Sequence, residues 1–415
     1  MGSAAGTTET RNQILSWNKL VFELAIEEDK LLTLKGLRTA TMMHLAIHDA
    51  LNTIEPRYEP YRYAGRAANA NPEIITAAAA SEVLRHHYPN QKARINDLVS
   101  AHVDHGELNQ TEIAVVQIGR ASAQAMIAER EGDNWNSEAE YVWHPMAPGV
   151  YAEFKDHSGT PEGFIFGTGW AQAKPFVLSK PSQFRSPPPP AIQSDAYTKA
   201  YNEVKEVGRF QSMTRTPDQT HLALWWKDFI ENSHNRLARA LAVETGLDGW
   251  QTARMFALLN MAIYDAYLSS FENKFHYNHW RPYTAIRWAA NDGNEDTIPD
   301  ELWDNTHRHT YPFPSYPSAH GTAAGAAMTA LAEVLGDNMA FTMHTETVDA
   351  AGPFGAKIAM NPPAREFNSF SEAALECAMS RVYLGIHFRY DSVEGNKLGK
   401  QVGMWVVKHA LREKK

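Results

Sequence analysis

The chain has 415 residues, of which 44% are apolar, and its formal net charge is −9 at pH 7. This length and apolar content allow a sizeable core, and 11 Trp, 17 Phe and 16 Tyr exclude an intrinsically disordered protein. The acidic balance argues against a protein that wraps nucleic acid or lies on anionic lipid, so we expect no nucleic-acid or membrane partner.

The chain begins with small and polar residues over 1–7, which are typical of an added tag or a disordered leader. No apolar run reaches the ~18 residues that a membrane-spanning helix needs. The single cysteine, Cys377, excludes an intramolecular disulfide but does not fix the compartment. A periplasmic or secreted origin would follow if a signal peptide had been removed.

Helical periodicity dominates and strand-like alternation is scarce, which predicts an all-α protein of packed helical bundles with long irregular loops. The clearest helical stretches cover residues 113–128, 251–270, 322–335 and 372–383. Residues 38–50 (RTATMMHLAIHDA) and 254–266 (RMFALLNMAIYDA) share Arg, Ala, Ile, Asp and Ala at the same spacing. This likeness indicates two bundles related by an internal duplication, with chance similarity between two buried helices as the alternative.

Residues 145–192 are rich in Pro and Gly and include the four-proline run 187–190, which favours polyproline II over helix. The aromatic residues inside this stretch indicate a loop packed on the body of the protein. A second irregular stretch covers residues 291–317. We therefore expect a first helical bundle over 13–145, a packed connection over 146–195 and a second helical bundle over 196–412, which carries an oxyanion site.

Three motifs in the second half carry chemistry. In the first, Lys274 and Arg281 are seven residues apart, so a continuous helix would place them two turns apart on one face. Pro282 biases Arg281 away from helical geometry, which predicts that Arg281 lies where this helix ends. Two solvated cations are the plain alternative.

The second motif is Pro317-Ser-Ala-His320, directly before a Gly- and Ala-rich helix. Ser318 is typical of a helix N-cap, and free N–H groups at a helix N-terminus suit an anion. A well-capped buried helix, with His320 as an ordinary surface residue, is the alternative for this motif taken alone.

The third motif contains Arg381, Gly385, His387 and Asp391. Arg381 and His387 do not share a helical face, but a helix break at Gly385 would let both side chains converge. Asp391 follows His387 by four residues and is placed to hydrogen-bond a ring nitrogen and fix its tautomer. The alternative is a helix end with ordinary polar decoration.

Taken together and in this order, Lys-x6-Arg-Pro, Pro-Ser-x-His and Ser-Arg-x5-His-x3-Asp resemble the signature of the vanadium haloperoxidase and type 2 phosphatidic acid phosphatase superfamily. The resemblance extends to residues 17–18, 46–50, 174–178 and 256–282, which look like bacterial vanadium-dependent haloperoxidases of similar length. It implies vanadate as the cofactor, with phosphate able to occupy the same site. It also implies two helical bundles with the site in the second.

The resemblance assigns a role to each motif residue. His387 is similar to the axial ligand that bonds vanadium through a ring nitrogen. The oxygens of the cofactor would be held by Lys274, Arg281, Arg381, Ser318 and the backbone N–H of Ala319. His320 would act as the acid and base, and Lys274 would also polarise bound peroxide. Burying a multiply charged anion requires this many donors, and bidentate Arg side chains suit a fixed oxyanion.

This chain departs from the family where Ala319 replaces the usual Gly. The N–H donor is retained, but the added methyl group bears on substrate access, and a positive φ at this position would be strained. Phe313 resembles the Phe of chloride-oxidising fungal relatives, whereas Phe271 stands where the fungal enzyme has Trp. Both residues are expected to line the halide and substrate pocket.

The resulting hypothesis is an enzyme that uses H2O2 to oxidise halide, bromide and in the demanding case chloride, to a hypohalous acid equivalent that halogenates small organic substrates. A soluble acid phosphatase with His387 as nucleophile is the first alternative, and a non-redox acid/base enzyme on the same scaffold is the second. A homo-oligomer is left open. A zinc site built from His276, His279, His307 and His309 would need further ligands that the sequence does not supply.

Overall fold

The computed structural model describes residues 4–103, 108–152 and 155–414, so the expected leader lies outside it at residues 1–3. Residues 4–7 form the start of the first helix. The chain divides into two compact units, of which unit 1 comprises residues 1–136, 231–264 and 405–415, and unit 2 comprises residues 137–230 and 265–404. This grouping differs from the linear boundaries expected near residues 145 and 196, because two long helices contribute residues to both units.

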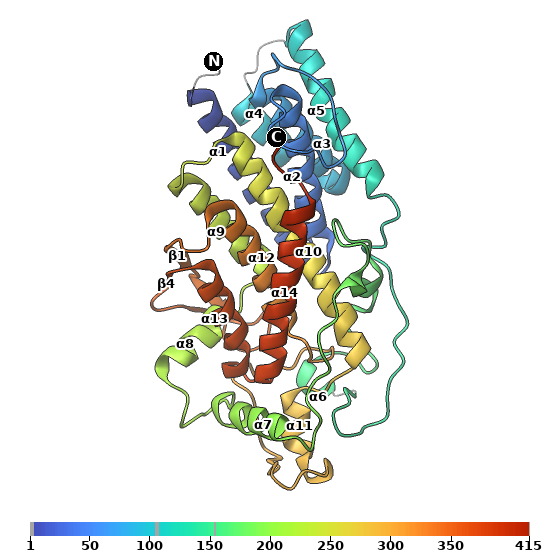
Figure 1. The fold of residues 1–415 in the computed structure, drawn as a ribbon, viewed down its shortest axis with the longest axis vertical. Helices are drawn as coiled ribbons and strands as arrows, with labels where there is room; N and C mark the ends of the chain where they lie inside the picture. Colours follow the sequence, from blue (N-terminus) through green and yellow to red (C-terminus); the bar gives the residue numbers. More distant parts are fainter. Residues whose placement is uncertain (1–3, 104–107, 153–154, 415) are drawn as a thin grey trace. The chain divides into compact units, whose positions relative to one another are not determined.

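Unit 1 is a helical bundle whose helices cover one another through small and aliphatic side chains. Helices α2, α3 and α5 pack against one another (Figure 1). Asn109 caps α5 in a capping box with Glu112, which satisfies N–H groups at the start of that helix. The helices of unit 1 are α1 (Ala4–Asp29), α2 (Lys35–Ile54), α3 (Pro72–His87), α4 (Lys92–His102), α5 (Gln110–Glu129), α9 (Ile230–Glu244) and the first part of α10 (Gly249–Tyr277), with the 3-10 turn η1 (Pro89–Gln91).

Unit 2 contains the second set of helices, together with the long loops. Thr216, Ser318 and Ser369 each accept a hydrogen bond from a backbone N–H three residues ahead, so these residues fix where α8, α12 and α13 begin. The elements are the end of α10, α6 (Lys155–Ser158), α7 (Asp195–Val207), α8 (Pro217–Trp225), α11 (Pro282–Trp288), α12 (Ala319–Leu335), α13 (Phe370–Tyr383) and α14 (Arg389–His409), with η2 (Thr168–Gln172), η3 (Pro181–Gln183) and η4 (Ala289–Asn291). Within the described ranges, no helix has the length and apolar character needed to cross a membrane.

The helical stretches predicted at 113–128, 251–270, 322–335 and 372–383 are confirmed as parts of α5, α10, α12 and α13. The protein is mostly helical, but the expectation of an all-α fold is wrong in one respect. Residues 341–367 form two small antiparallel sheets, in which β1 (Phe341–His344) pairs with β4 (Ala364–Phe367) and β2 (Thr347–Asp349) pairs with β3 (Lys357–Ala359). Side chains alternate between buried and exposed along β1, which is the pattern of a half-buried strand.

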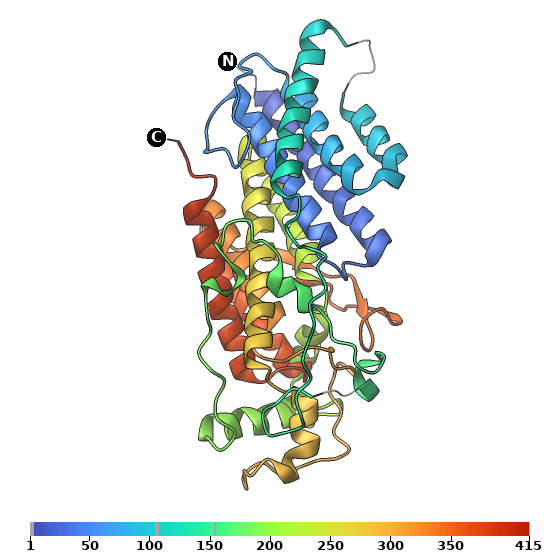
Figure 2. The ribbon, with the colours of Figure 1, turned by 90° about the vertical axis from the view of Figure 1, so that its right-hand side faces the viewer.

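The long connection is packed, as its aromatic residues indicated. Its backbone N–H groups at Phe176, Val177 and Leu178 donate to the buried carboxylate of Asp265 at 2.7, 2.8 and 2.9 Å. Figure 2 shows this segment, in green, running beside α10, in yellow. Three charge-assisted hydrogen bonds to one carboxylate hold the loop without regular secondary structure.

Glycines bring α14 into backbone contact with α12 inside unit 2. A Cβ atom added to Gly395, Gly399 or Gly403 would lie 2.6, 2.1 or 2.8 Å from carbonyl oxygens of Ser318, Thr322 and Ala326, respectively. Each distance is too short for a side chain, so this spacing of four residues requires glycine. The contact fixes the N-terminus of α12, and with it Ser318, against the helix that follows His387.

Candidate active site

Lys274 and Arg281 are both fully buried, but they do not share a helix. Helix α10 ends at Tyr277, and Asn278 adopts a left-handed φ of 47°, which breaks the helix before Arg281. Arg281 then precedes Pro282 as the N-cap residue of α11. The expectation of one continuous helical face was therefore wrong, because the chain turns between the two cations.

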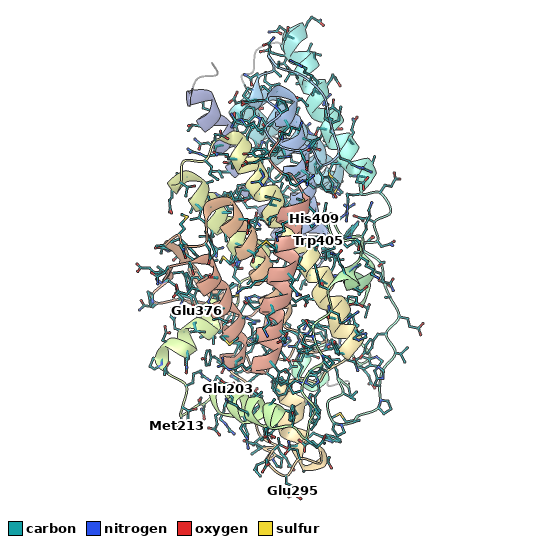
Figure 3. The ribbon with its side chains drawn as sticks, in the orientation of Figure 1. Glu203, Met213, Glu295, Glu376, Trp405 and His409 are labelled. Carbon is teal, nitrogen blue, oxygen red and sulfur yellow. The ribbon has the colours of Figure 1, made fainter. Side chains whose placement is uncertain are left out.

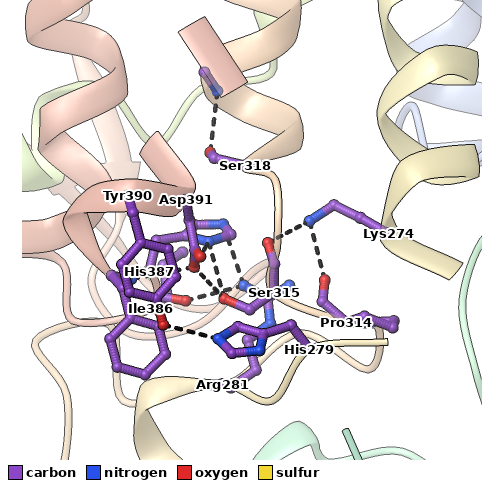
Figure 4. Close-up of polar contacts among 12 residues, drawn as sticks. Lys274, His279, Arg281, Pro314, Ser315, Ser318, Ile386, His387, Tyr390 and Asp391 are labelled. Atoms are coloured by element: carbon purple, nitrogen blue, oxygen red, sulfur yellow. Dashed lines mark hydrogen bonds and ion pairs between the residues drawn. The ribbon is translucent and has the colours of Figure 1, made fainter. Parts of the chain in front are cut away.

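Both cations are anchored by carbonyl oxygens of the segment that leads into α12 (Figure 4). The Lys274 ammonium donates to the carbonyls of Pro314 and Ser315 at 3.0 and 2.8 Å. The Arg281 Nε donates to the Phe313 carbonyl at 3.0 Å, and its Nη1 donates to the Ile386 carbonyl at 3.0 Å. The irregular segment 312–317 therefore orients both cations by its backbone.

His387 lies between Arg281 and a buried carboxylate. Its Nδ1 is 2.9 Å from Asp391 Oδ2, and its Nε2 is 3.2 Å from Arg281 Nη1. The Ser315 hydroxyl also donates to Asp391 Oδ2 and lies 3.2 Å from His387 Nδ1. The predicted contact between His387 and Asp391 is confirmed, and Gly385 does break the chain after α13, with a φ of 82°.

These contacts select one form of the His387 ring. A carboxylate beside Nδ1 favours the tautomer in which Nδ1 carries the proton and donates it, so the Nε2 lone pair points toward the cations. Burial lowers the pKa of His387 well below its usual value, and Arg281, Lys274, Arg381 and His320 lower it further. The ring is neutral at neutral pH, which is the form that can bond a metal.

The second histidine lies at the N-terminus of α12. Ser318 is the N-cap, as predicted, and its hydroxyl oxygen accepts from Gly321 N at 3.1 Å, which leaves the hydroxyl proton available as a donor. Ala319 is the first helical residue and does not adopt a positive φ, so its methyl group introduces no backbone strain. His320 Nε2 donates to the Trp226 carbonyl at 2.6 Å and its side chain is partly exposed.

Trp226 connects His320 with the third cation. Its carbonyl also accepts from Arg381 Nη1 at 3.4 Å. The Trp226 indole N–H donates to Glu376 at 2.9 Å, and Glu376 lies on α13 (Figure 3), the helix that carries Arg381. No sequence motif points to Trp226, because its role depends on a carbonyl oxygen and not on a side-chain type.

The site has more positive charge than its own residues offset. Burial and the charge of Arg281 lower the pKa of Lys274 well below its usual value, and burial lowers the pKa of Arg281 to about 10. Burial raises the pKa of the Asp391 carboxyl to about 7, although its hydrogen bond with Ser315 and the charges of Lys274 and Arg281 lower it. One carboxyl group that is itself hard to ionise cannot offset three cations.

Two unpaired guanidinium nitrogens indicate what kind of ligand this positive charge would bind. Arg281 Nη2 and Arg381 Nε are both buried and have no hydrogen-bond partner among the described residues. Buried N–H donors of this kind require an acceptor. Donors from Arg281, Arg381, Lys274 and Ser318, close to a neutral imidazole, fit a small tetrahedral oxyanion that also bonds to nitrogen.

An aromatic wall borders the cations. The Phe313 ring lies 5.3 Å from the Lys274 ammonium and 4.8 Å from the Arg281 guanidinium carbon. The Phe271 ring lies 5.2 Å from that of Phe313. Phe166 and Trp170 extend the wall from the packed connection, with ring centroids 5.8 Å from Phe313 and 4.8 Å from Phe271, respectively. The sequence predicted that this connection is packed but not that it reaches the site.

The alternative of a zinc site has no support in the described ranges, where no group of three His, Cys, Asp or Glu side chains is arranged to hold a metal ion. His307 and His309 are neighbours, with ring centroids 5.5 Å apart. His279 instead contacts the Tyr390 hydroxyl at 2.8 Å, and His276 is exposed. These four histidines therefore do not form one cluster.

The chain is similar to known vanadium-dependent haloperoxidases. The family model described as the VCPO second helical-bundle domain matches residues 254–414. The vanadium chloroperoxidase of Curvularia inaequalis is 24% identical over 489 residues, covering 92% of this chain and 79% of the relative. The vanadium-dependent bromoperoxidase of Ascophyllum nodosum is 30% identical over 121 residues, which is 28% of this chain and 21% of that protein.

Solved structures share the fold over nearly the whole chain. A bacterial vanadium-dependent iodoperoxidase has a TM-score of 0.78 and 23% identity, covering 98% of each chain. The holo form of a bacterial vanadium-dependent chloroperoxidase has a TM-score of 0.69 and 17% identity, covering 90% of each chain. The matching second bundle and the two relatives show that the chain is similar to vanadium haloperoxidases, and the solved structures show that it shares their fold.

Proposed function

We propose that this protein is a vanadium-dependent haloperoxidase that oxidises bromide with H2O2. The overall reaction is Br⁻ + H2O2 + H⁺ → HOBr + H2O, and the hypobromous acid then halogenates small organic substrates. The observation that carries the proposal is the group of buried cations around the neutral His387, in which Arg281 Nη2 and Arg381 Nε have no partner among the described residues.

In this proposal, His387 Nε2 would be the vanadium ligand, while Asp391 holds the opposite ring nitrogen. Lys274, Arg281 and Arg381, with the Ser318 hydroxyl and the Ala319 N–H, hold the oxygens of vanadate and offset their charge. Bound vanadate supplies Lewis-acid activation of H2O2 without a change in its own oxidation state. Arg281 Nη1, which now lies 3.2 Å from Nε2, would turn from the ring to an oxygen.

His320 is proposed as the group that exchanges the proton of the reaction. Its Nε2–H donates to the Trp226 carbonyl, so exchange with peroxide falls to Nδ1. Lys274 would place a positive charge where negative charge develops on the peroxide oxygen. The ammonium is held by two carbonyls and cannot swing away, which suits an electrostatic role.

Bromide is proposed as a substrate because aromatic side chains surround the cations. Phe313 lies against both Lys274 and Arg281, and the Phe271 and Trp170 rings continue the apolar wall. Apolar neighbours exclude water and strengthen the electrostatic effect of the cations on peroxide. Iodide is easier to oxidise than bromide and should also react, whereas chloride is the demanding test.

Two assays separate this proposal from a phosphatase on the same scaffold. Vanadate-loaded protein should halogenate a phenolic dye with H2O2 and bromide, whereas the vanadate-free form should hydrolyse a phosphate ester poorly. Robust ester hydrolysis with no oxidation of any halide would show that the protein is a phosphatase and not a haloperoxidase. Activity in neither assay would favour acid/base chemistry on an organic substrate.

His387→Ala should abolish both tight vanadate binding and bromination, because the nitrogen ligand is lost while little apolar volume is removed. Equilibrium titration with vanadate and a thermal melt measure binding and folding separately. His276→Ala, which changes an exposed histidine, is the matched control and should retain both properties. Full vanadate binding by His387→Ala would show that His387 is not the ligand.

A further inference from the structure

A second group of basic side chains lies in unit 2 and is not used by the proposed vanadate site. Lys227 follows α8, and His307 and His309 lie on the irregular segment that leads to Phe313. The backbone N–H of His307 donates to the Leu384 carbonyl at 3.1 Å, and the backbone carbonyl of His307 accepts from Gly352 N at 2.8 Å. These backbone bonds hold His307 beside the end of α13, the helix that carries Arg381.

The His307 ring is fully buried, and neither of its nitrogens has a hydrogen-bond partner among the described residues. Its ring neighbours are His309 and Tyr311, with centroids 5.5 and 5.2 Å away. A buried imidazole with two unpaired nitrogens costs free energy and calls for a ligand or water that the protein itself does not provide. Arg381 lies on α13, three residues before the Leu384 carbonyl that His307 contacts.

The electrostatic surroundings of the ring are basic. Burial holds the pKa of His307 well below its usual value, and the basic groups Lys227, Arg381, His309 and His157 lower it further. The neutral ring therefore has one N–H to donate. The Lys227 ammonium donates to the backbone carbonyl of Asp349, whereas the Asp349 carboxylate lies 2.9 Å from Lys357. The Asp304 carboxylate lies 2.9 Å from His157 Nε2, so both of these carboxylates already have a partner.

We propose that His307, with Lys227 and Arg381 as neighbouring positive charges, forms a halide subsite, in which the His307 ring N–H hydrogen-bonds one bromide or iodide ion. The proposal rests on the proposed function, since Arg381 is shared with the oxyanion. A monatomic anion accepts N–H donors from any direction and needs no donor group in return. It also loses less hydration on burial than a multiply charged oxyanion does, which suits a site with few donors.

Arg381 would then have two neighbours of negative charge, the oxyanion and the halide. Its Nη1 contacts the Trp226 carbonyl, which also holds His320, so the subsite adjoins the proposed acid/base group. A halide ion kept there would be close to the oxygen that it must attack. Lys227, with a pKa lowered to about 8 mainly by burial, would gain a counter-ion when halide binds.

Replacement of His307 tests the subsite in the vanadate-loaded enzyme. His307→Phe keeps the ring volume and removes both nitrogens, so the KM for bromide should rise about tenfold, the usual loss for one hydrogen bond to an ion. The dissociation constant for vanadate should change less than twofold. His307→Gln restores an N–H donor and should recover part of the bromide affinity. His87→Gln, at a histidine of unit 1 that also has an unpaired buried nitrogen, should change neither.

A bromide soak of vanadate-free crystals tests binding independently of activity. The anomalous difference map should show bromide within hydrogen-bond distance of His307 in the wild type and not in His307→Phe. The proposal is overturned if no such peak appears, if His307→Phe keeps the wild-type KM, or if it weakens vanadate and bromide equally. A bromide ion at His307 in a protein that brominates nothing would support the subsite and defeat the proposed function.

Discussion

Ser315 contacts both Asp391, the partner of His387, and Lys274. Its hydroxyl donates to Asp391 Oδ2, and its carbonyl accepts from Lys274 at 2.8 Å. Its N–H donates to the His279 carbonyl at 2.8 Å, so the backbone around it is fixed. Ser315 therefore orients the carboxylate that sets the His387 tautomer, while it also positions Lys274 beside the aromatic wall.

Ser315→Ala should weaken vanadate binding by about tenfold, because Asp391 loses an O–H donor and its hold on His387 loosens. The measurement is a vanadate titration, with a thermal melt to show that the fold is retained. Ser315→Thr keeps the hydroxyl and is the matched control. An unchanged vanadate affinity in Ser315→Ala would show that Asp391 and His387 hold their geometry without this residue.

At the residue scale, side-chain types in ordered motifs predicted most of the candidate site. The motifs were chosen for the chemistry of Lys274, Arg281, Arg381 and His387. In the structure, the charges of the three cations all act on the His387 ring. Ser315 and Trp226 could not be chosen in the same way. One acts partly, and the other wholly, through a carbonyl oxygen, and every residue type has a carbonyl.

At the element scale, the packing of α12 on α14 determines where Ser318 and His320 lie. Gly399 is the tightest point, where an added Cβ would lie 2.1 Å from the Thr322 carbonyl oxygen. Gly395 makes the corresponding contact with the Ser318 backbone. The N-terminus of α12 can therefore approach the segment that carries His387 only because these positions of α14 have no side chain.

Gly399→Ala should force α12 and α14 apart. Overpacking of this kind costs about 1–3 kcal/mol, which outweighs the gain of about 1 kcal/mol from replacing a helical glycine. Chemical denaturation should show a net loss of stability, and vanadate affinity should fall because Ser318 moves. Lys400→Ala, at the exposed neighbouring position, should change neither. A stable Gly399→Ala protein with unchanged vanadate affinity would contradict the close-packed interface.

Helix positions were predictable where periodicity was strong, as in α5, α10, α12 and α13. The break at Asn278 was not, because a single left-handed residue leaves no periodic signal. The strands at 341–367 were missed for a related reason, since three- and four-residue strands are too short for alternation to be evident. Tertiary contacts, such as the ring pair of Phe341 and Phe367 at 5.6 Å, stabilise them.

At the scale of the whole molecule, the internal duplication stays a prediction. The repeat placed Asp49 and Asp265 at matching positions, and each binds an irregular segment in the same way. Asp49 accepts from the N–H groups of Tyr61, Arg62 and Tyr63, as Asp265 does from three consecutive residues of the connection. A shared loop-binding carboxylate in each unit is what a duplicated bundle would retain.

The most direct test of the account is the crystal structure of the protein after incubation with vanadate. We expect one vanadium atom per chain, bonded to His387 Nε2, with its oxygens hydrogen-bonded to Arg281 Nη2 and Arg381 Nε. Vanadate bound elsewhere in the protein, with His387 Nε2 still in contact with Arg281, would show that the proposed cofactor site is wrong.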